Sequence, residues 1–326
     1  MNRCKPGLRW TFTPGQESQK SANSGIAEMI DKIFFFHNLK AGGSSLRLII
    51  ESRFQAEKRC PLIELNKVDH EYFRGDYARF RGYDLYAGHY GQDIFAAVND
   101  DHSCITNFRH PATRLISLYN FFRFKVNLPD EELHTERYYA VLLAKSVSFE
   151  RFVSADDPRV DVYVRNAHFR QLTNSCWSLD TTNKVGGVFR FIDRMPWYYV
   201  CEYPDLSLLW MRRVFNWDVD QMPWENVTGN GSGRVTSLST LDDRTHRIIR
   251  IKNNLDFVLY RYAVNRFLIR SGPRNGSSGW RQPLRQKFVP SVREVSPYII
   301  FQKIALAESK VCRVGFGMHL FWGSFV

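Results

Sequence analysis

A short apolar run, followed at once by a glycine-containing turn and an amphipathic segment, constrains the fold of this chain most. The stretch reads IFFFHNLKAGGSSLRLIIESRF and covers residues 33–54. A continuous apolar run of this kind is typical of a strand that is buried on both faces of a parallel sheet. Leu46, Ile49 and Ile50 then recur at the spacing of one helix face. The stretch therefore predicts a strand, a tight turn and a helix in succession.

The same order is repeated further along the chain. Strands are expected in LYAGHYG at 85–91 and in CITNF at 104–108, and Pro111 suits the first turn of the helix that follows. Helical structure is expected over 131–175, 205–217 and 242–268, the last broken near Asn253, and later strands in VGGVFRFI at 185–192 and WYYVCEY at 197–203. This alternation predicts an α/β protein with a mostly parallel central sheet flanked by helices, in a three-layer, P-loop-like arrangement.

Length and composition indicate one globular unit with less regular ends. The chain has 326 residues, of which 44% are hydrophobic and 15% aromatic, so it can bury a sizeable core. Residues 1–31 are polar and contain prolines, glycines and serines, which predicts a flexible leader. The segment SGPRNGSSGW at 271–280 predicts a linker. We therefore expect one domain over 32–270 and a C-terminal extension over 271–326.

The charge balance favours an anionic ligand. Lysine and arginine number 45 against 33 acidic residues, which gives a net charge of +12. Such a balance attracts nucleic acid, anionic membranes, anionic cofactors or acidic sugars. We find no nucleic-acid-binding motif, so no nucleic-acid partner is expected.

The cysteines and the hydropathy bear on metal binding and compartment. The 6 cysteines form no C-x-x-C pair and none pairs closely with a histidine in the manner of a zinc site, so we expect no metal site and reduced thiols. No stretch approaches the roughly 20 apolar residues of a membrane span. We therefore expect a cytoplasmic protein of bacterial type without a transmembrane segment. The alternative is the Golgi lumen, if the chain is a fragment of an anchored protein.

The turn at residues 40–45 has the composition of an anion-binding loop. Gly42 and Gly43 permit close approach of the backbone, and Lys40 adds a positive charge. Ser44 and Ser45 add hydroxyls at the start of a helix, where free amides favour an anion. The order of residues differs from the G-x-x-x-x-G-K-[ST] loop of nucleotide triphosphatases. Taken alone, the loop fits two interpretations: a phosphate cradle, or an ordinary turn with capping serines and a solvated lysine.

Three expected strand ends carry groups that suit chemistry on an anion. Lys40 follows the run at 33–36, His89 follows 85–87, and Arg109 follows 104–108. Ligands of open α/β sheets bind beyond the carboxyl ends of the strands, so we expect the three side chains to meet. A histidine suits a general base, although a lone one is more often structural. Ser117 lies opposite the apolar positions of its helix, so it is either simply exposed or turned with Arg109 towards a phosphate.

Taken together, these segments resemble the carbohydrate sulfotransferases that use 3′-phosphoadenosine 5′-phosphosulfate (PAPS), in particular the heparan and dermatan sulfate 2-O-sulfotransferases and similar bacterial proteins. The family's P-K-T-x-[GS]-[ST]-[ST] loop is matched by LKAGGSS at 39–45. Its R-D-P-x-x-R-x-x-S-x-Y segment is matched by RHPATRLISLY at 109–119, and its G-H segment by YAGHYG. Weaker matches follow around Asn166 and Gln171, around Glu202 and Ser207, and in NNLDFVLYRYA. The resemblance covers residues 33–268.

The resemblance implies transfer of a sulfonyl group from PAPS to a hydroxyl of a carbohydrate acceptor by a sulfotransferase domain over 32–270. An acidic or lipid-linked glycan is among the expected acceptors, and no metal is required. His89 would be the catalytic base, and Lys40 would stabilise the departing bisphosphate. Arg109 and Ser117 would hold the 3′-phosphate. The 5′-phosphosulfate would be held by Lys40, Ala41, Gly42, Gly43, Ser44 and Ser45.

Two other functions remain as alternatives. One is a P-loop-type nucleotide kinase, which the sequence disfavours because Lys40 precedes the glycines and no G-K-[ST] occurs. The other is a non-catalytic protein that binds an anion or a glycan, which the positive net charge supports.

Overall fold

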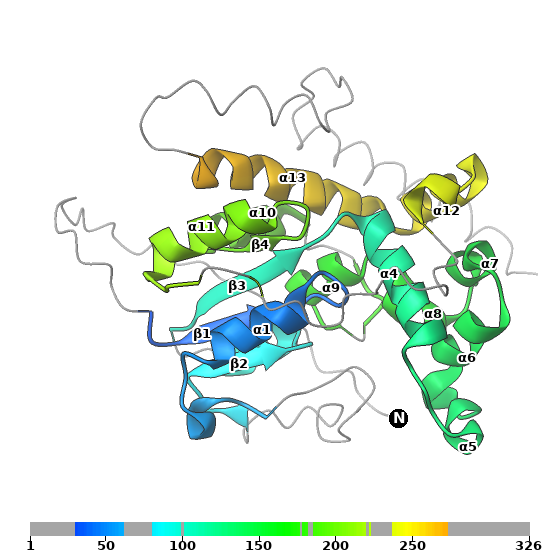
Figure 1. The fold of residues 1–326 in the computed structure, drawn as a ribbon, viewed down its shortest axis with the longest axis horizontal. Helices are drawn as coiled ribbons and strands as arrows, with labels where there is room; N and C mark the ends of the chain where they lie inside the picture. Colours follow the sequence, from blue (N-terminus) through cyan, green and yellow to red (C-terminus); the bar gives the residue numbers. More distant parts are fainter. Residues whose placement is uncertain are drawn as a thin grey trace, which may run out of the picture.

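Four parallel strands form the centre of the molecule. The computed structural model describes residues 30–61, 80–98, 101–176, 178–181, 185–219, 222 and 237–272. The strands are β1 (Ile33–Phe36), β2 (Leu85–Gly88), β3 (Ser103–Phe108) and β4 (Tyr199–Val200), in the order β2-β1-β3-β4. All neighbouring pairs are parallel. The sequence-based prediction of an α/β protein with a parallel sheet flanked by helices is therefore confirmed (Figure 1).

The order of the strands defines where a ligand would bind. β1 pairs with β2 on one side and with β3 on the other, so Ile33 lies opposite both Leu85 and Ser103. The chain passes from β1 to β2, then crosses back past β1 to β3 and β4. The direction of winding thus reverses between β1 and β3. In open α/β sheets the crevice outside the carboxyl ends at such a reversal is the usual ligand position.

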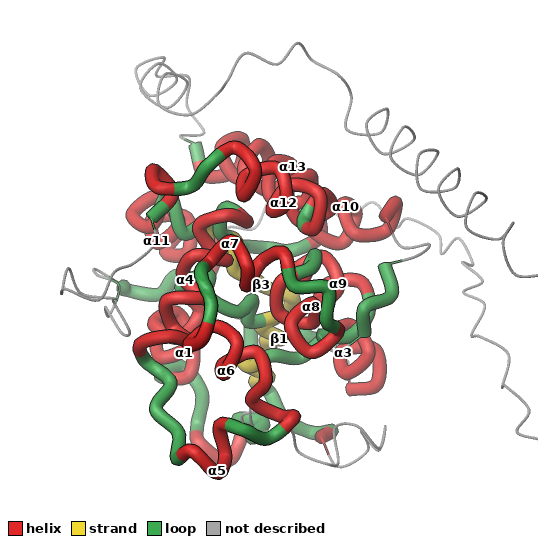
Figure 2. The backbone as a smooth tube through the Cα atoms, turned by 90° about the vertical axis from the view of Figure 1, so that its right-hand side faces the viewer, coloured by secondary structure: helices red, strands yellow, loops and turns green. Residues whose placement is uncertain are grey.

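Helices surround the sheet and extend beyond the carboxyl ends of its strands. In Figure 1, α1 crosses the sheet in front of β1 and β2, and the helices from α4 to α8 lie past the ends of the strands. Figure 2 shows β1 and β3 between α1 and α4 on one side and α8 and α9 on the other. The α-helices are α1 (Gly43–Glu51), α3 (Gln92–Val98), α4 (Pro111–Phe124), α5 (Asp130–Leu133), α6 (Tyr139–Ser146), α7 (Phe149–Ser154), α8 (Pro158–Val164), α9 (Ala167–Thr173), α10 (Val185–Arg194), α11 (Pro204–Phe215), α12 (Asp243–Lys252) and α13 (Asn254–Ser271). Short 3₁₀ turns occupy η1 (Ala56–Lys58), η3 (Glu136–Tyr138) and η4 (Leu238–Thr240).

Two apolar clusters form the core. The larger one contains the whole of β1, whose four side chains are buried, together with apolar side chains of α1, α10, α11 and α13. The second joins α4 to α6, α7 and α8, with Leu115, Leu118 and Phe152 among its members. The loops that end β1, β2 and β3 therefore lie on a sheet fixed by the first cluster, next to a helical layer fixed by the second.

One secondary-structure prediction was wrong. VGGVFRFI was expected to be a strand but belongs to helix α10. Val188, Ile192 and Met195 recur at helical spacing and are buried, whereas Arg190 and Asp193 are exposed. This 3.6-residue period decides the structure over the local preference of β-branched and aromatic residues for strands. In WYYVCEY only Tyr199–Val200 pairs as a strand. The helix break near Asn253 is confirmed by the boundary between α12 and α13.

Two helices that frame the site cap each other at their N-termini. Asn166, just before α9, accepts hydrogen bonds through Oδ1 from the amides of Leu255 and Asp256 in α13. Asp256 in turn accepts through its carboxylate from the amides of His168 and Phe169 in α9. These are the amides that a helix start leaves without intrahelical partners. The reciprocal caps fix α9 against α13 and so fix the wall that α9 contributes beside the sheet.

The structure describes only a small part of the segments predicted at the two chain ends. Residues 1–29 of the expected leader and 273–326 of the expected extension lie outside the described residues. The described helices include none with the length and apolar character that crossing a bilayer requires. The compartment stays a prediction.

Candidate functional site

The turn after β1 presents an uncapped helix N-terminus. Gly42 is the N-cap of α1 with φ 79°, and as a glycine it has no side chain that could cap the helix. Lys40 also has a positive φ, 63°, which is uncommon for a residue with a Cβ. Within the described part of the chain, the amides of Gly43 and Ser44 have no hydrogen-bond acceptor. The N-cap position is thus held by Gly42 and not by Ser44 or Ser45, and the amides of Gly43 and Ser44 are available to an anion.

Gly43 is required because the ring of His37 lies against it. A Cβ added at Gly43 would lie 2.0 Å from Cδ2 and 2.2 Å from Nε2 of His37. The His37 ring is stacked on Phe35 with centroids 5.4 Å apart and lies 4.5 Å from the ring of His89. It cannot move aside without disturbing both neighbours. The sequence predicted that the glycines let another group approach the backbone closely. At Gly43 that group is the ring of His37.

We expect Gly43→Ala to lower the free energy of unfolding by about 1–3 kcal/mol, the usual range for overpacking a filled site. A urea titration measures the change. The matched control is Gly187→Ala in α10, where nothing lies within 4 Å of the added Cβ. That substitution should stabilise by about 0.5–1 kcal/mol, because alanine loses less backbone entropy in a helix. Adding His37→Ala to Gly43→Ala should recover only part of the loss, because Asn107 Nδ2 also lies 2.9 Å from the added Cβ. An undiminished loss would contradict the steric role of His37.

A buried amide from β3 holds the turn in place. Asn107 accepts a hydrogen bond through Oδ1 from the amide of Asn38 at 2.7 Å. Its Nδ2 donates to the carbonyls of Asn38 at 3.1 Å and Ala41 at 2.9 Å. Asn107 is fully buried, so these bonds are protected from water. Asn107 is not predictable from the sequence motifs, although a polar side chain inside the apolar run CITNF was the available signal.

Lys40 and Arg109 meet at the mouth of the turn, as predicted. The Arg109 Nη1 group donates to the Lys40 carbonyl at 3.1 Å, and its Nε donates to Thr113 Oγ1 at 3.3 Å. The Lys40 ammonium lies 3.8 Å from the centroid of the Phe121 ring. Burial, followed by the charge of Arg109, lowers the pKa of Lys40 to about 8. None of the described carboxylates forms an ion pair with either cation, so both charges are available to an anion.

Ser117 lies on the stripe of α4 that faces these cations. Thr113, Ser117 and Phe121 are spaced by four residues, so they share one side of the helix. Thr113 contacts Arg109, and Phe121 contacts Lys40. Ser117 therefore lies between the two contacts. All three side chains are partly exposed, whereas the apolar side of α4 is buried, which confirms that Ser117 is not a core residue.

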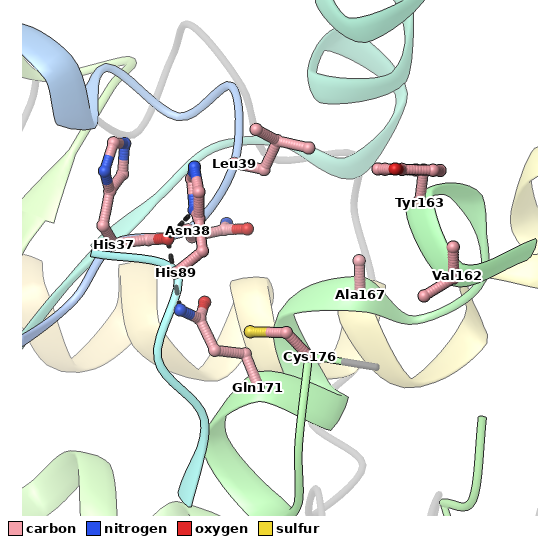
Figure 3. Close-up of a pocket in the computed structure, with 9 residues that line it drawn as sticks. All are labelled: His37, Asn38, Leu39, His89, Val162, Tyr163, Ala167, Gln171 and Cys176. Atoms are coloured by element: carbon pink, nitrogen blue, oxygen red, sulfur yellow. Dashed lines mark hydrogen bonds between the residues drawn. The ribbon is translucent and has the colours of Figure 1, made fainter. Parts of the chain in front are cut away.

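His89 is held as a neutral base with one free ring nitrogen. Its Nδ1 lies 2.9 Å from the His37 carbonyl (Figure 3). A carbonyl only accepts, so Nδ1 carries the proton and Nε2 keeps its lone pair. Burial is the main cause that lowers the pKa of His89 to about 4, and the charges of Arg47 and Lys40 lower it further, against the raising effect of the His37 hydrogen bond. His89 is therefore neutral at neutral pH.

Gln171 of α9 positions the two strand ends that flank His89. Its side-chain amide nitrogen, Nε2, donates to the His37 carbonyl at 3.1 Å and to the Tyr90 carbonyl at 3.0 Å. The His37 carbonyl thus accepts from both Gln171 and His89, which fixes the orientation of the base (Figure 3). Gln171 comes from one of the weaker sequence motifs, and its buried position explains why a glutamine is needed there.

Two other residues of the weaker motifs support the framework around the site. Glu202 accepts a hydrogen bond through Oε1 from the amide of His110 at 2.8 Å, at the start of α4. Ser207 Oγ accepts from the Val200 amide at 3.0 Å and donates to the Tyr203 carbonyl at 2.8 Å. These bonds fix the end of β4 and the start of α4 and have no direct part in binding.

A pocket opens beside His89, away from the cations. The pocket is small and partly open to solvent. The lining comes from residues 37–39 and His89 on one side and from α8, α9 and Cys176 on the other (Figure 3). His89 therefore borders this pocket, while Lys40 follows directly after the lining residue Leu39.

The described residues offer neither a metal-binding cluster nor a disulfide. The described residues contain no cluster of three or more histidine, cysteine, aspartate or glutamate side chains arranged to hold a metal ion. Cys60, Cys104, Cys176 and Cys201 are free thiols. The reduced state of the thiols stays a prediction.

The comparisons with known proteins add no relative. No protein-family model matches this chain, and a search of curated proteins finds no match either.

Proposed function

We propose that the protein is a sulfotransferase that moves a sulfonyl group from PAPS to a hydroxyl of a carbohydrate. One observation carries the proposal. Two cations without carboxylate partners, Lys40 and Arg109, and an uncapped helix start lie next to a neutral histidine whose Nε2 is free. All of them lie at the carboxyl ends of β1, β2 and β3, where the winding of the sheet reverses.

The two anionic ends of PAPS fit the two parts of the cation site. The amides at the start of α1 and the Lys40 ammonium suit the 5′-phosphosulfate, so we infer that the β1–α1 unit works as a P-loop-like cradle. Arg109 offers a planar guanidinium to the 3′-phosphate, and the Ser117 hydroxyl lies on the same side of α4. This assignment follows the motif resemblance of 39–45 and 109–119 and adds to it the unpaired charges.

The site residues have separate tasks in the transfer. His89 Nε2 takes the proton of the acceptor hydroxyl, whose oxygen bonds to sulfur while the bond between sulfur and the bridging oxygen breaks. The electron pair of that bond leaves with adenosine 3′,5′-bisphosphate. Lys40 stabilises the negative charge that develops there, and its partial burial strengthens this interaction. The rest of the work is in-line positioning, as in phosphoryl transfer.

The two alternatives explain fewer of these features. A nucleotide kinase of the P-loop class has its lysine after the glycines, whereas Lys40 precedes Gly42 and Gly43. A non-catalytic anion-binding protein accounts for the cations and the net charge of +12. It gives no role to a neutral His89 whose tautomer is fixed by the His37 carbonyl.

A thermal-shift experiment on the full chain separates the three functions. We expect adenosine 3′,5′-bisphosphate to raise the melting temperature, and ATP with magnesium and a DNA oligomer to have much smaller effects. Transfer of radiolabelled sulfonate from PAPS to a mixed oligosaccharide pool then tests catalysis directly. Stabilisation by ATP with magnesium alone would favour the kinase, and bisphosphate binding without any turnover would favour the binding protein.

A further inference from the structure

The pocket beside His89 differs in chemistry from the neighbouring cation site. None of its described lining residues is an aspartate, glutamate, lysine or arginine. Leu39, Val162 and Ala167 supply apolar surface, and Asn38, Gln171 and Tyr163 supply neutral polar groups. His37 and His89 also border it, and burial lowers the pKa of both, so neither adds a charge at neutral pH.

Asn38 brings an unused hydrogen-bond donor to this pocket. Its side-chain amide points into the pocket from the end of β1 (Figure 3). The residue is only 2% exposed, and its Nδ2 has no hydrogen-bond partner. Its backbone is fixed by two hydrogen bonds to Asn107, which hold the residue at the pocket wall. A buried donor without an acceptor is unfavourable, and a ligand oxygen would satisfy it.

We propose that this pocket binds an uncharged, hydroxyl-bearing ring, such as a neutral sugar residue, as the reacting group of the acceptor. This inference rests on the proposed function and narrows its substrate class. The reacting hydroxyl donates to His89 Nε2, and a neighbouring hydroxyl accepts from Asn38 Nδ2. The apolar surface of Leu39, Val162 and Ala167 faces the C–H groups of the ring. Any acidic groups of a longer glycan then lie outside the pocket.

The charged groups near the pocket are already engaged elsewhere. Arg114 donates to the carbonyls of Tyr163 and Val164. Arg170 donates to four carbonyls, those of Val162, Arg165, Cys176 and Ser178. Both arginines therefore support the wall from behind, and the remaining Nε of Arg114 is buried without a hydrogen-bond partner. On the other side, Arg47 pairs with Glu51, and the proposed function assigns Lys40 to the anionic donor. A carboxylate in the pocket would lose water without gaining a cation.

Matched glycosides test this inference on the full chain. The methyl glycosides of glucose and galactose are compared with those of glucuronic and galacturonic acid, which differ from them by the carboxylate alone. Binding is measured by calorimetry with adenosine 3′,5′-bisphosphate present. We expect at least one neutral glycoside to bind at least about 10-fold more tightly than its uronic acid partner. Equal binding, tighter binding of the uronides, or binding of neither class would overturn the inference.

Two substitutions locate the binding in the pocket. Asn38→Ala should weaken the binding of the neutral glycoside by about 3- to 10-fold, the usual effect of one neutral hydrogen bond. Ala167→Phe, at a partly exposed position of the wall, should abolish glycoside binding by filling the space. The control Ala96→Phe adds the same ring on an exposed position of α3 and should change nothing. Unchanged glycoside binding in Ala167→Phe would overturn the location.

The affinity for adenosine 3′,5′-bisphosphate separates failure of this inference from failure of the proposed function. We expect the dissociation constant of the bisphosphate to stay within about twofold in Asn38→Ala and Ala167→Phe, because neither side chain belongs to the cation site. A protein that binds the bisphosphate but prefers uronides contradicts the neutral pocket alone. A protein that does not bind the bisphosphate at all contradicts the sulfotransferase proposal itself.

Discussion

His89→Ala is expected to reduce sulfonyl transfer by about 10²- to 10⁴-fold, the usual contribution of a general base. The substitution removes the Nε2 atom that accepts the proton. The other ring nitrogen, Nδ1, only holds the ring on the His37 carbonyl. The bisphosphate should still bind within a few-fold of the unaltered affinity, since Lys40 and Arg109 remain. Transfer of radiolabelled sulfonate from PAPS and calorimetry with the bisphosphate measure the two effects separately.

The control and the pH profile make this result specific. His134→Ala removes an exposed histidine at the end of α5 and should leave transfer unchanged. The pKa of His89 is lowered to about 4, so the base form persists as the pH falls from 7 to 5. The acid limb of kcat/KM, which reports the free enzyme, should therefore lie well below the pKa of about 6.5 of an unperturbed histidine. Retained turnover in His89→Ala would refute the assignment of the base.

A second consequence concerns the enzyme with its donor bound. Arg47 and Lys40 are among the causes that lower the pKa of His89. An anionic donor next to Lys40 offsets this positive charge, and so favours the protonated ring. The acid limb of kcat, which reports the complex, should then lie at higher pH than the limb of kcat/KM. The base is thus weakly basic in the free enzyme and becomes more basic when the donor is in place.

The sequence predicted the sheet where each strand is a continuous apolar run. β1 is such a run, β2 (LYAG) is buried throughout, and β3 (SCITNF) is buried over its last four residues although some of them are polar. VGGVFRFI contains the same residue types, yet only the spacing of Val188 and Ile192 shows that it forms a helix. Residue type alone is therefore a poor guide in short apolar segments, because it does not say which neighbours bury them.

The charged residues of the candidate site were predictable from the sequence, but the residues that hold them in place were not. Lys40, His89 and Arg109 follow strands directly, so the parallel sheet brings them to one edge. Asn107 and Gln171 act through contacts with residues 69 and 134 positions away in the chain. No local pattern encodes partners at such separations. The uncapped start of α1 was likewise undecided by the sequence, because serines at 44 and 45 fit both a capped and a free N-terminus.

Arg109→Ala is expected to weaken the binding of adenosine 3′,5′-bisphosphate by about 10- to 100-fold, because a hydrogen bond to a charged group contributes about 1.5–3 kcal/mol. Arg109 also donates to the Lys40 carbonyl, so its loss has a second, structural effect on the turn. That effect should be the same for every ligand of the turn. Adenosine 5′-phosphosulfate is an analogue without the 3′-phosphate. If Arg109 binds the 3′-phosphate itself, the affinity for this analogue should therefore fall by less than about threefold in Arg109→Ala.

The ratio of the two losses carries the argument. Arg151→Ala removes the same charge from an exposed position of α7 and should change neither affinity, which excludes a general effect of net charge. Equal losses for the bisphosphate and the phosphosulfate in Arg109→Ala would mean that the arginine only supports the Lys40 turn. A selective loss for the bisphosphate would mean that the cation site reads the 3′-phosphate. That group distinguishes PAPS from ATP, so selectivity at Arg109 separates a sulfotransferase from a kinase on the same scaffold.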